Sequence, residues 1–107
     1  MSELTQCSSS EPFALRVIGD DMAPEFRDGQ VIVIDPGGQV KSGSFVVARV
    51  DGEAIFRQLI IDEGGYRLCA LQPNLPEIAL ASGLDAIVGV VSQRAGKRRH
   101  EHKRYDL

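Results

Sequence analysis

The sequence contains no apolar run long enough to span a membrane, and its first residues lack the basic and apolar regions of a signal peptide. Cysteine is scarce: Cys7 and Cys69 lie far apart and form no C-x-x-C pair. Two free thiols in a reducing compartment are expected, with a disulfide between them as the alternative. We therefore predict a cytoplasmic protein that does not associate with a membrane.

The sequence also lacks the motifs of several enzyme and cofactor classes. It has no G-x-S-x-G nucleophile elbow, no P-loop and no glycine-rich dinucleotide fingerprint. One acidic stretch lacks the D-x-D-x-D-G spacing of a calcium loop. The pair His100 and His102 supplies only two of the about four ligands of a structural metal site. We therefore predict no metal and no cofactor, and a solvated role for the acidic residues Asp20, Asp21, Glu25 and Asp28.

Charge is unevenly distributed along the 107 residues. Residues 1–93 carry 6 basic and 13 acidic side chains, a balance of −7, whereas residues 94–107 carry 6 basic and 2 acidic ones, a balance of +4. The basic end has two interpretations. It contacts nucleic-acid phosphates without sequence preference, or it is a solvated end that folds over its own acidic body. The residues of the first interpretation are Lys97, Arg98, Arg99, Lys103 and Arg104.

The length suits one domain, and composition predicts its limits. Residues 1–12 are polar and serine-rich, and we expect a flexible arm there. Residues 13–93 alternate short apolar runs with turn signals, and we expect the folded domain there. Residues 94–107 look too polar to pack and are expected to form a basic flexible tail.

Short strands separated by turns dominate the predicted domain. The segments SFVVARV and AIFRQLII flank DGE, which predicts the clearest hairpin in the chain. A single helical turn is expected at MAPEF (22–26). Five or more short strands with regular turns predict a mostly β domain, either a barrel or a sandwich. The other expected strands are FALRVIG (13–19), VIVIDP (31–36), YRLCAL (66–71) and AIVGVVSQ (86–93).

Three segments resemble the LexA/UmuD-type peptidase domain, peptidase family S24, to which signal peptidases are more distantly related. GDDM (19–22) stands where the family has G-D-S-M. DGQVIVIDP…SGSFVVARVDGEAIFRQL (28–59) matches the family's D-G-D-hydrophobic run, its V-V-A strand and its D-G-E hairpin. LQPNLPEI (71–78) and IVGVVSQ (87–93) match the P-x-N segment and the final G-V-V strand. The resemblance covers about Phe13 to Gln93 and implies a LexA/signal-peptidase-like, barrel-type fold.

The resemblance implies a Ser–Lys peptidase dyad, from which this sequence departs at both positions. The position of the nucleophile is Asp21, that of the base is Arg57, and the backbone of Met22 stands at the oxyanion position. Arginine stays protonated and cannot serve as the base, and aspartate has no hydroxyl to attack a peptide bond. We expect Asp21 and Arg57 to form an ion pair across the former cleft, with two solvated side chains as the alternative. Asp20 and Asn74 are expected to be further binding residues of this site.

The sequence therefore favours a catalytically inactive, dimerising protein-interaction module with an unidentified protein partner. A link to DNA-damage (SOS-type) regulation is implied by the family alone. The alternatives are an active S24-type serine peptidase with an altered dyad, a nucleic-acid-associated protein held by its tail, and a former substrate groove that binds an extended segment. A homodimer is expected through an unpaired edge of the last strand, at Ile87, Val88, Gly89, Val90 and Val91.

Overall fold

The computed structural model describes residues 11–81, 83–96 and 102–105. In this part of the chain, no helix is long and apolar enough to cross a membrane. Strands are the predominant regular structure, and the one helix is a short 3-10 turn, so for the described residues the predicted mostly β fold is confirmed. The elements are β1 (Phe13–Arg16), β2 (Val31–Asp35), β3 (Phe45–Val50), β4 (Glu53–Asp62), β5 (Gly65–Cys69), β6 (Ile78–Ala79), the 3-10 helix η1 (Gly83–Ala86), β7 (Ile87–Ala95) and β8 (Lys103–Arg104).

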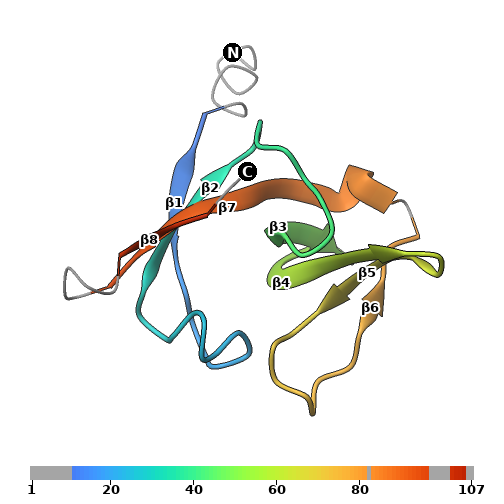
Figure 1. Cartoon of the computed structure of the whole chain (residues 1–107), viewed down its shortest axis with the longest axis horizontal. Coiled ribbons are helices and arrows are strands. Elements are labelled where there is room, and N and C mark those ends of the chain that lie inside the picture. Colours follow the sequence, from blue (N-terminus) through green and yellow to red (C-terminus); the bar gives the residue numbers. More distant parts are fainter. Residues whose placement is uncertain (1–10, 82, 97–101, 106–107) are drawn as a thin grey trace.

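All the strands belong to one antiparallel sheet with the order β1-β2-β7-β3-β4-β5-β6, and β8 pairs with β7 beside this path. Figure 1 shows β7 crossing the molecule from the group of β1, β2 and β8 to the group of β3, β4, β5 and β6. The first half of β7 pairs with β3, and its second half pairs with β2 and β8. Among the described strands, β1, β6 and β8 each have one partner strand and therefore lie at edges of the sheet.

The predicted Asp-Gly hairpin is confirmed between β3 and β4. The pairing runs from Phe45↔Gln58 to Val50↔Glu53. Asp51 and Gly52 lie between the strands with φ values of 52° and 83°. Positive φ at both central residues gives a turn whose twist matches that of the paired strands. The hairpin thereby fixes the register of β4, the strand that carries Arg57.

Two clusters of buried apolar side chains form the core. The first surrounds Phe26, which is fully buried and meets the rings of Phe45 and Phe56 edge to face, with centroids 4.8 Å and 4.9 Å away. The second lies among β3, β4, β5 and β7 and includes Leu59 and Leu68. Phe26 comes from the connection between β1 and β2, so its burial anchors this connection to the sheet.

The segment MAPEF forms a hydrogen-bonded turn and not the helical turn expected from the sequence. The amide of Phe26 donates to the carbonyl of Met22 at 2.9 Å, and the amide of Ala23 donates to the carbonyl of Asp20 at 3.0 Å. We call residues 20–26 the site turn. The helix η1 and the short strand β6 were not predicted, because neither has a distinct sequence pattern.

The chain remains folded beyond the limit predicted at residue 93. β7 continues to Ala95, and β8 pairs with it through Gln93↔Arg104 and Arg94↔Lys103. Tyr105 packs against the first core cluster. The structure therefore differs from the expectation that residues 94–107 are too polar to pack, because one aromatic ring and a short strand pairing attach the described part. The remaining tail residues Lys97, Arg98 and Arg99, and residues 1–10 of the predicted arm, lie outside the described residues.

The strand predicted to offer an open dimer edge lies inside the sheet. Val90 pairs with Val46 of β3 on one side and with Asp35 of β2 on the other, and it is 1% exposed. The strand is therefore not an edge without any partner: Ile87 and Gly89 pair with β3, Val91 pairs with β2, and Val90 pairs with both. A homodimer through Ile87–Val91 stays a prediction.

Candidate functional site

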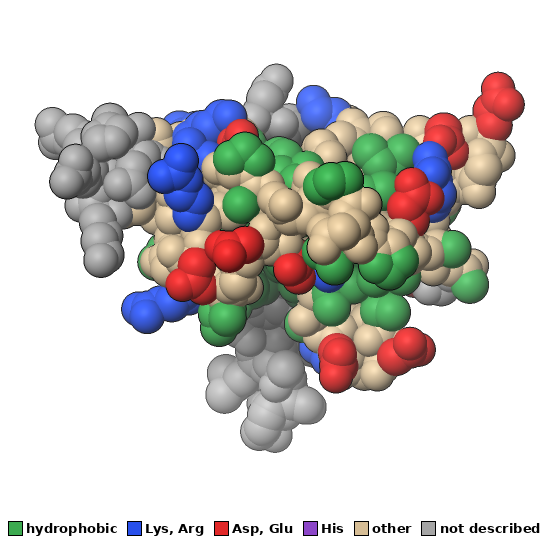
Figure 2. Space-filling model, turned by 90° about the horizontal axis from the view of Figure 1, so that it is seen from below, with side chains coloured by type: hydrophobic (Ala, Val, Ile, Leu, Met, Phe, Trp, Pro, Cys, Tyr) green, Lys and Arg blue, Asp and Glu red, His purple; other side chains and the backbone are tan. Residues whose placement is uncertain are grey.

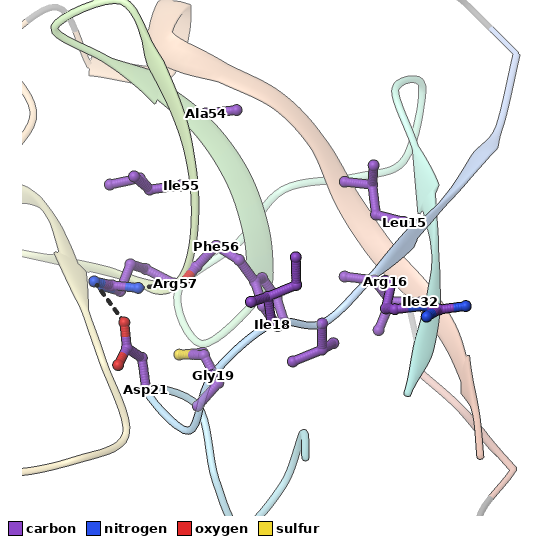
Figure 3. Close-up of a pocket in the computed structure, with 12 residues that line it drawn as sticks. Leu15, Arg16, Ile18, Gly19, Asp21, Ile32, Ala54, Ile55, Phe56 and Arg57 are labelled. Carbon is purple, nitrogen blue, oxygen red and sulfur yellow. Dashed lines mark hydrogen bonds and ion pairs between the residues drawn. The ribbon is translucent and has the colours of Figure 1, made fainter. Parts of the chain in front are cut away.

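A groove of about 270 Å³ lies between the end of β1 and the first half of β4 (Figure 3). Apolar side chains line both walls: Leu15 and Ile18 on the first, Ile55 and Phe56 on the second. Leu15 is 39% exposed and Ile18 is 84% exposed, so this apolar surface is accessible. Seen from below, the molecule shows hydrophobic side chains among acidic ones (Figure 2).

Both walls of the groove are strand edges without a partner strand among the described residues. β1 pairs with β2 on one side only. Residues 53–57 of β4 pair with β3, whereas the pairing of β4 with β5 begins at Gln58. An unpaired edge presents a row of backbone N–H and C=O groups. An extended peptide could add to such an edge through main-chain hydrogen bonds.

The structure brings Asp21 and Arg57 together in this groove (Figure 3). Nη2 of Arg57 lies 3.4 Å from Oδ2 of Asp21, and Nη1 donates to the carbonyl of Phe56 at 2.8 Å. The side chain of Arg57 is 18% exposed and that of Asp21 is 53% exposed. The guanidinium thus occupies one carbonyl of the open β4 edge as well as the carboxylate. A ligand that extends past Phe56 would have to compete with both contacts.

The turn that carries Asp21 depends on a glycine at its start. Gly19 has a φ of 88°, a left-handed conformation that side chains disfavour. Its amide donates to Oδ1 of Asp28 at 2.7 Å. Asp28 therefore serves the local backbone. Among the described residues, no group of three or more His, Cys, Asp and Glu side chains could hold a metal ion.

The connection between β5 and β6 supports the site turn from the other side. The amide of Leu71 donates to the carbonyl of Asp21 at 3.1 Å, and the side-chain amide of Gln72 donates to the carbonyl of Ala23 at 2.7 Å. The sequence analysis selected Asn74 from this connection. Asn74 is exposed and does not line the groove, so Leu71 and Gln72 provide the contacts instead.

Met22 and Asp20 differ in their exposure. The side chain of Met22 is 2% exposed and belongs to the first core cluster. Its amide donates no hydrogen bond to another described residue, so it is free to bind a carbonyl oxygen. Asp20 is exposed and forms no ion pair within the described part of the chain.

Glu25 is a site residue that the sequence analysis treated only as a solvated acid. Its Oε2 accepts hydrogen bonds from Lys103 Nζ at 2.7 Å and Tyr105 OH at 2.6 Å, and Arg94 Nη1 lies at 3.2 Å. Arg94 also donates to the carbonyl of Glu25. Burial acts to raise the pKa of Glu25, but these hydrogen bonds and the charges of Lys103 and Arg94 lower it below the ordinary 4.5. The cluster agrees with the interpretation that the basic end folds over the acidic body.

The remaining candidates are dispersed. Cys69 is a half-buried free thiol, and burial raises its pKa, whereas Cys7 lies outside the described residues. His102 is exposed, and His100 lies outside the described residues. Arg104 is exposed on β8. The structure thus gathers Asp21, Arg57 and the site turn in one place, and neither of the two described candidates, Cys69 and His102, lines the groove with them.

Comparison with known proteins identifies the family. The sequence matches the family described as Peptidase S24-like over residues 2–92. It is 43% identical over 98 residues to the HTH-type transcriptional regulator for conjugative element R391 of Providencia rettgeri, covering 85% of this chain and 45% of the regulator. It is 38% identical over 94 residues to the prophage repressor CohE of Escherichia coli, covering 85% and 42%. It is 38% identical over 82 residues to the LexA repressor of Geobacter metallireducens, covering 74% and 41%.

The chain therefore belongs to the peptidase S24-like family. It is homologous to LexA and to repressors of phages and conjugative elements. It spans less than half the length of these relatives.

Proposed function

We propose that this domain is a non-hydrolytic protein-interaction module that holds an extended peptide segment in the groove between β1 and β4. The observation that carries the proposal is the Asp21–Arg57 ion pair in a groove whose two walls are strand edges that no other described strand pairs with. By the family resemblance, these residues stand at the nucleophile and base positions. A protonated guanidinium cannot accept the proton of a nucleophile, and an aspartate paired with it is a poor nucleophile toward an amide.

The geometry supports a peptide with apolar side chains in extended conformation. Main-chain hydrogen bonds to the free edge of β1 or β4 would give affinity, and alternate side chains would enter the apolar groove. Leu15, Ile18 and Ile55 are the contacts expected for those side chains. The free amide of Met22 is a donor for a peptide carbonyl.

A direct test is to select peptides on the intact protein from a displayed library and to map their site by NMR. We expect backbone shifts concentrated at residues 16–19 and 54–57. Ile18→Lys and Ile55→Lys should weaken binding. Leu84→Lys is the matched control, because Leu84 is 43% exposed on η1 and does not line the groove. Shifts confined to other surfaces would refute the proposal.

The same peptides separate this proposal from an active peptidase with an altered dyad. Each peptide is incubated with the protein and then weighed by mass spectrometry. The interaction module should return every peptide intact. Cleavage that disappears in Asp21→Ala and Arg57→Ala would instead make the protein an enzyme.

The regulatory setting is proposed from the relatives. Their names describe transcriptional regulators and repressors, so we infer that the module acts in transcriptional control, including control of the DNA-damage type. A homodimer and a further protein partner stay predictions. Light scattering over a wide concentration range tests the dimer, and a concentration-independent monomer mass would exclude it.

Nucleic-acid binding through the basic end is a second candidate. Arg104 is exposed, whereas Lys103 and Arg94 already contact Glu25, so fewer free charges remain than the sequence suggests. Binding of an oligonucleotide that falls steeply with added salt would favour this candidate.

A further inference from the structure

Three donors from the C-terminal part of the chain converge on one carboxylate of the site turn. Arg94 comes from β7, and Lys103 and Tyr105 come from the segment that contains β8. All three reach Oε2 of Glu25. We call Glu25, Arg94, Lys103 and Tyr105 the C-terminal clamp. Hydrogen bonds to a charged acceptor are stronger than neutral ones, so the clamp is a substantial link between the two ends of the domain.

The ring of Tyr105 extends this link into the core. It stacks on Phe26 with centroids 5.5 Å apart and meets Phe45 at 5.7 Å. The amide of Phe26 in turn donates to the carbonyl of Met22. One aromatic side chain therefore contacts the residue that closes the site turn, and its hydroxyl contacts the preceding residue, Glu25.

We propose that the C-terminal clamp sets the position of the site turn, and that Glu25 and Tyr105 are positioning residues for the groove. The site turn carries Asp21 and the free amide of Met22, so a shift of the turn would move both. The effect on peptide binding rests on the proposed function; the effect on the turn itself does not.

The attachment of β8 is of a kind that can open. β8 has two residues and two register pairs with β7, whereas β3 and β4 share six register pairs. Lys103 is 48% exposed. Elements with few buried contacts open locally at a lower free energy than the core. When β8 is paired with β7, the clamp holds the site turn in one conformation. When β8 detaches, the site turn would become more mobile while the rest of the domain stays folded.

The test uses amide hydrogen exchange of the full chain, followed by NMR. The amides of Ala23 and Phe26 are bonded within the site turn, and the amide of Leu59 is bonded to Ser44 O in the core sheet. Tyr105→Phe removes the hydroxyl and keeps the ring. We expect exchange at Ala23 and Phe26 to rise about tenfold, the size expected for one lost hydrogen bond to a charged group, and exchange at Leu59 to rise clearly less.

Glu25→Gln and two matched controls complete the set. Glu25→Gln removes the charge that Lys103, Arg94 and Tyr105 share, so it should accelerate exchange at Ala23 and Phe26 at least as much as Tyr105→Phe. The double variant should show less than the sum of the two effects, because both changes weaken the contact between Glu25 and Tyr105. Tyr66→Phe and Glu77→Gln change the same residue types outside the clamp and should leave Ala23 and Phe26 unaffected. Equal acceleration at Leu59, or no acceleration at the site turn, would overturn the proposal.

Peptide affinity then separates the two proposals. If the clamp acts as stated, Tyr105→Phe should weaken a groove-binding peptide several-fold. Faster exchange at Ala23 and Phe26 in Tyr105→Phe, together with a wild type that binds no peptide, would support the clamp and refute the proposed function. Peptide binding that is insensitive to Tyr105→Phe, with unchanged exchange, would refute the clamp and leave the proposed function intact.

Discussion

The guanidinium of Arg57 lies 3.4 Å from the carboxylate of Asp21 and also donates to the carbonyl of Phe56. This arrangement joins the site turn to β4 across the groove. Asp21 is 53% exposed, so water screens the pair, and the energy of a fully buried ion pair does not apply. The contact is more significant for the chemistry of the groove than for stability, because it occupies both side chains at the positions where the family resemblance expects a dyad.

Removing one partner should cost little but measurable stability. We expect Asp21→Ala to lower the free energy of unfolding by about 0.5–1 kcal/mol, the range of partly exposed ion pairs. The double change Asp21→Ser with Arg57→Lys should lower it less, because it leaves no unpaired guanidinium in the groove wall. Urea unfolding of the three proteins measures these differences.

Asp20→Ala is the matched control for this pair. Asp20 is the adjacent acidic residue, is exposed and makes no ion pair among the described residues. It should change the unfolding free energy by less than Asp21→Ala does. Equal effects at both positions would mean that the ion pair contributes nothing.

The strands were largely predictable, because their signals are local. The Asp-Gly turn at Asp51 and Gly52 fixes the β3–β4 hairpin, and alternating apolar residues mark β1. The contact between Asp21 and Arg57 could not be predicted from local sequence. The two residues are far apart in sequence, and only the family resemblance suggested that they meet.

The contacts of the tail could not be predicted from composition. The side chains of Lys103 and Arg104 predict a solvent-exposed, unstructured segment. Both side chains are exposed, but their backbone forms the strand β8. Tyr105 was the available signal, because an aromatic residue in a polar tail often packs on the body. Which acidic residue would receive its hydroxyl depends on the fold of the site turn, and Glu25 could not be chosen from several exposed acids.

The position of β7 between β2 and β3 was not predicted either, because an apolar strand has the same sequence pattern at the edge of a sheet and in its interior. Gly89 offers a test of its packing. A Cβ atom at this position would lie 2.6 Å from Cγ2 of Ile34 and 3.1 Å from the carbonyl oxygen of Asp35. We expect Gly89→Ala to lower the unfolding free energy by roughly 1–3 kcal/mol through overpacking.

Gly37→Ala controls for the loss of a glycine as such. Its added Cβ would lie 3.7 Å from Asp35 Oδ1, an ordinary contact distance. It should be close to neutral in the same thermal or urea unfolding. If Gly89→Ala were also neutral, β7 would not pack against β2 as closely as the structure describes.

The aromatic cluster provides a prediction for the anchor of the site turn. Phe26 is fully buried against Phe45, Phe56 and Tyr105. Phe26→Ala should lower the unfolding free energy by about 3–5 kcal/mol, the range for a large ring removed from a core. Phe13→Ala removes a ring that is 37% exposed and should cost clearly less. Similar losses in chemical denaturation would contradict the assignment of Phe26 to the core.

The last prediction concerns pH and Glu25. The pKa of Glu25 is lowered from 4.5, because the donors from Lys103 and Tyr105 and nearby positive charge outweigh burial. A lowered pKa means that the folded protein binds the proton of Glu25 more weakly than the unfolded chain does. This contribution to stability is fully present above pH 4.5 and is lost as the pH falls through the lowered pKa. Thermal unfolding between pH 7 and pH 3 should show the loss.

Glu25→Gln should remove this part of the acid sensitivity, because glutamine does not titrate. It should lower stability at pH 7, where the wild type keeps the charged clamp, and the two proteins should converge in acid. Glu77→Gln serves as the control, since Glu77 pairs with Arg67, which lies outside the clamp. Its stability difference from the wild type should not follow the same pH profile. Parallel curves for wild type and Glu25→Gln would show that the carboxylate of Glu25 is not held by the C-terminal segment.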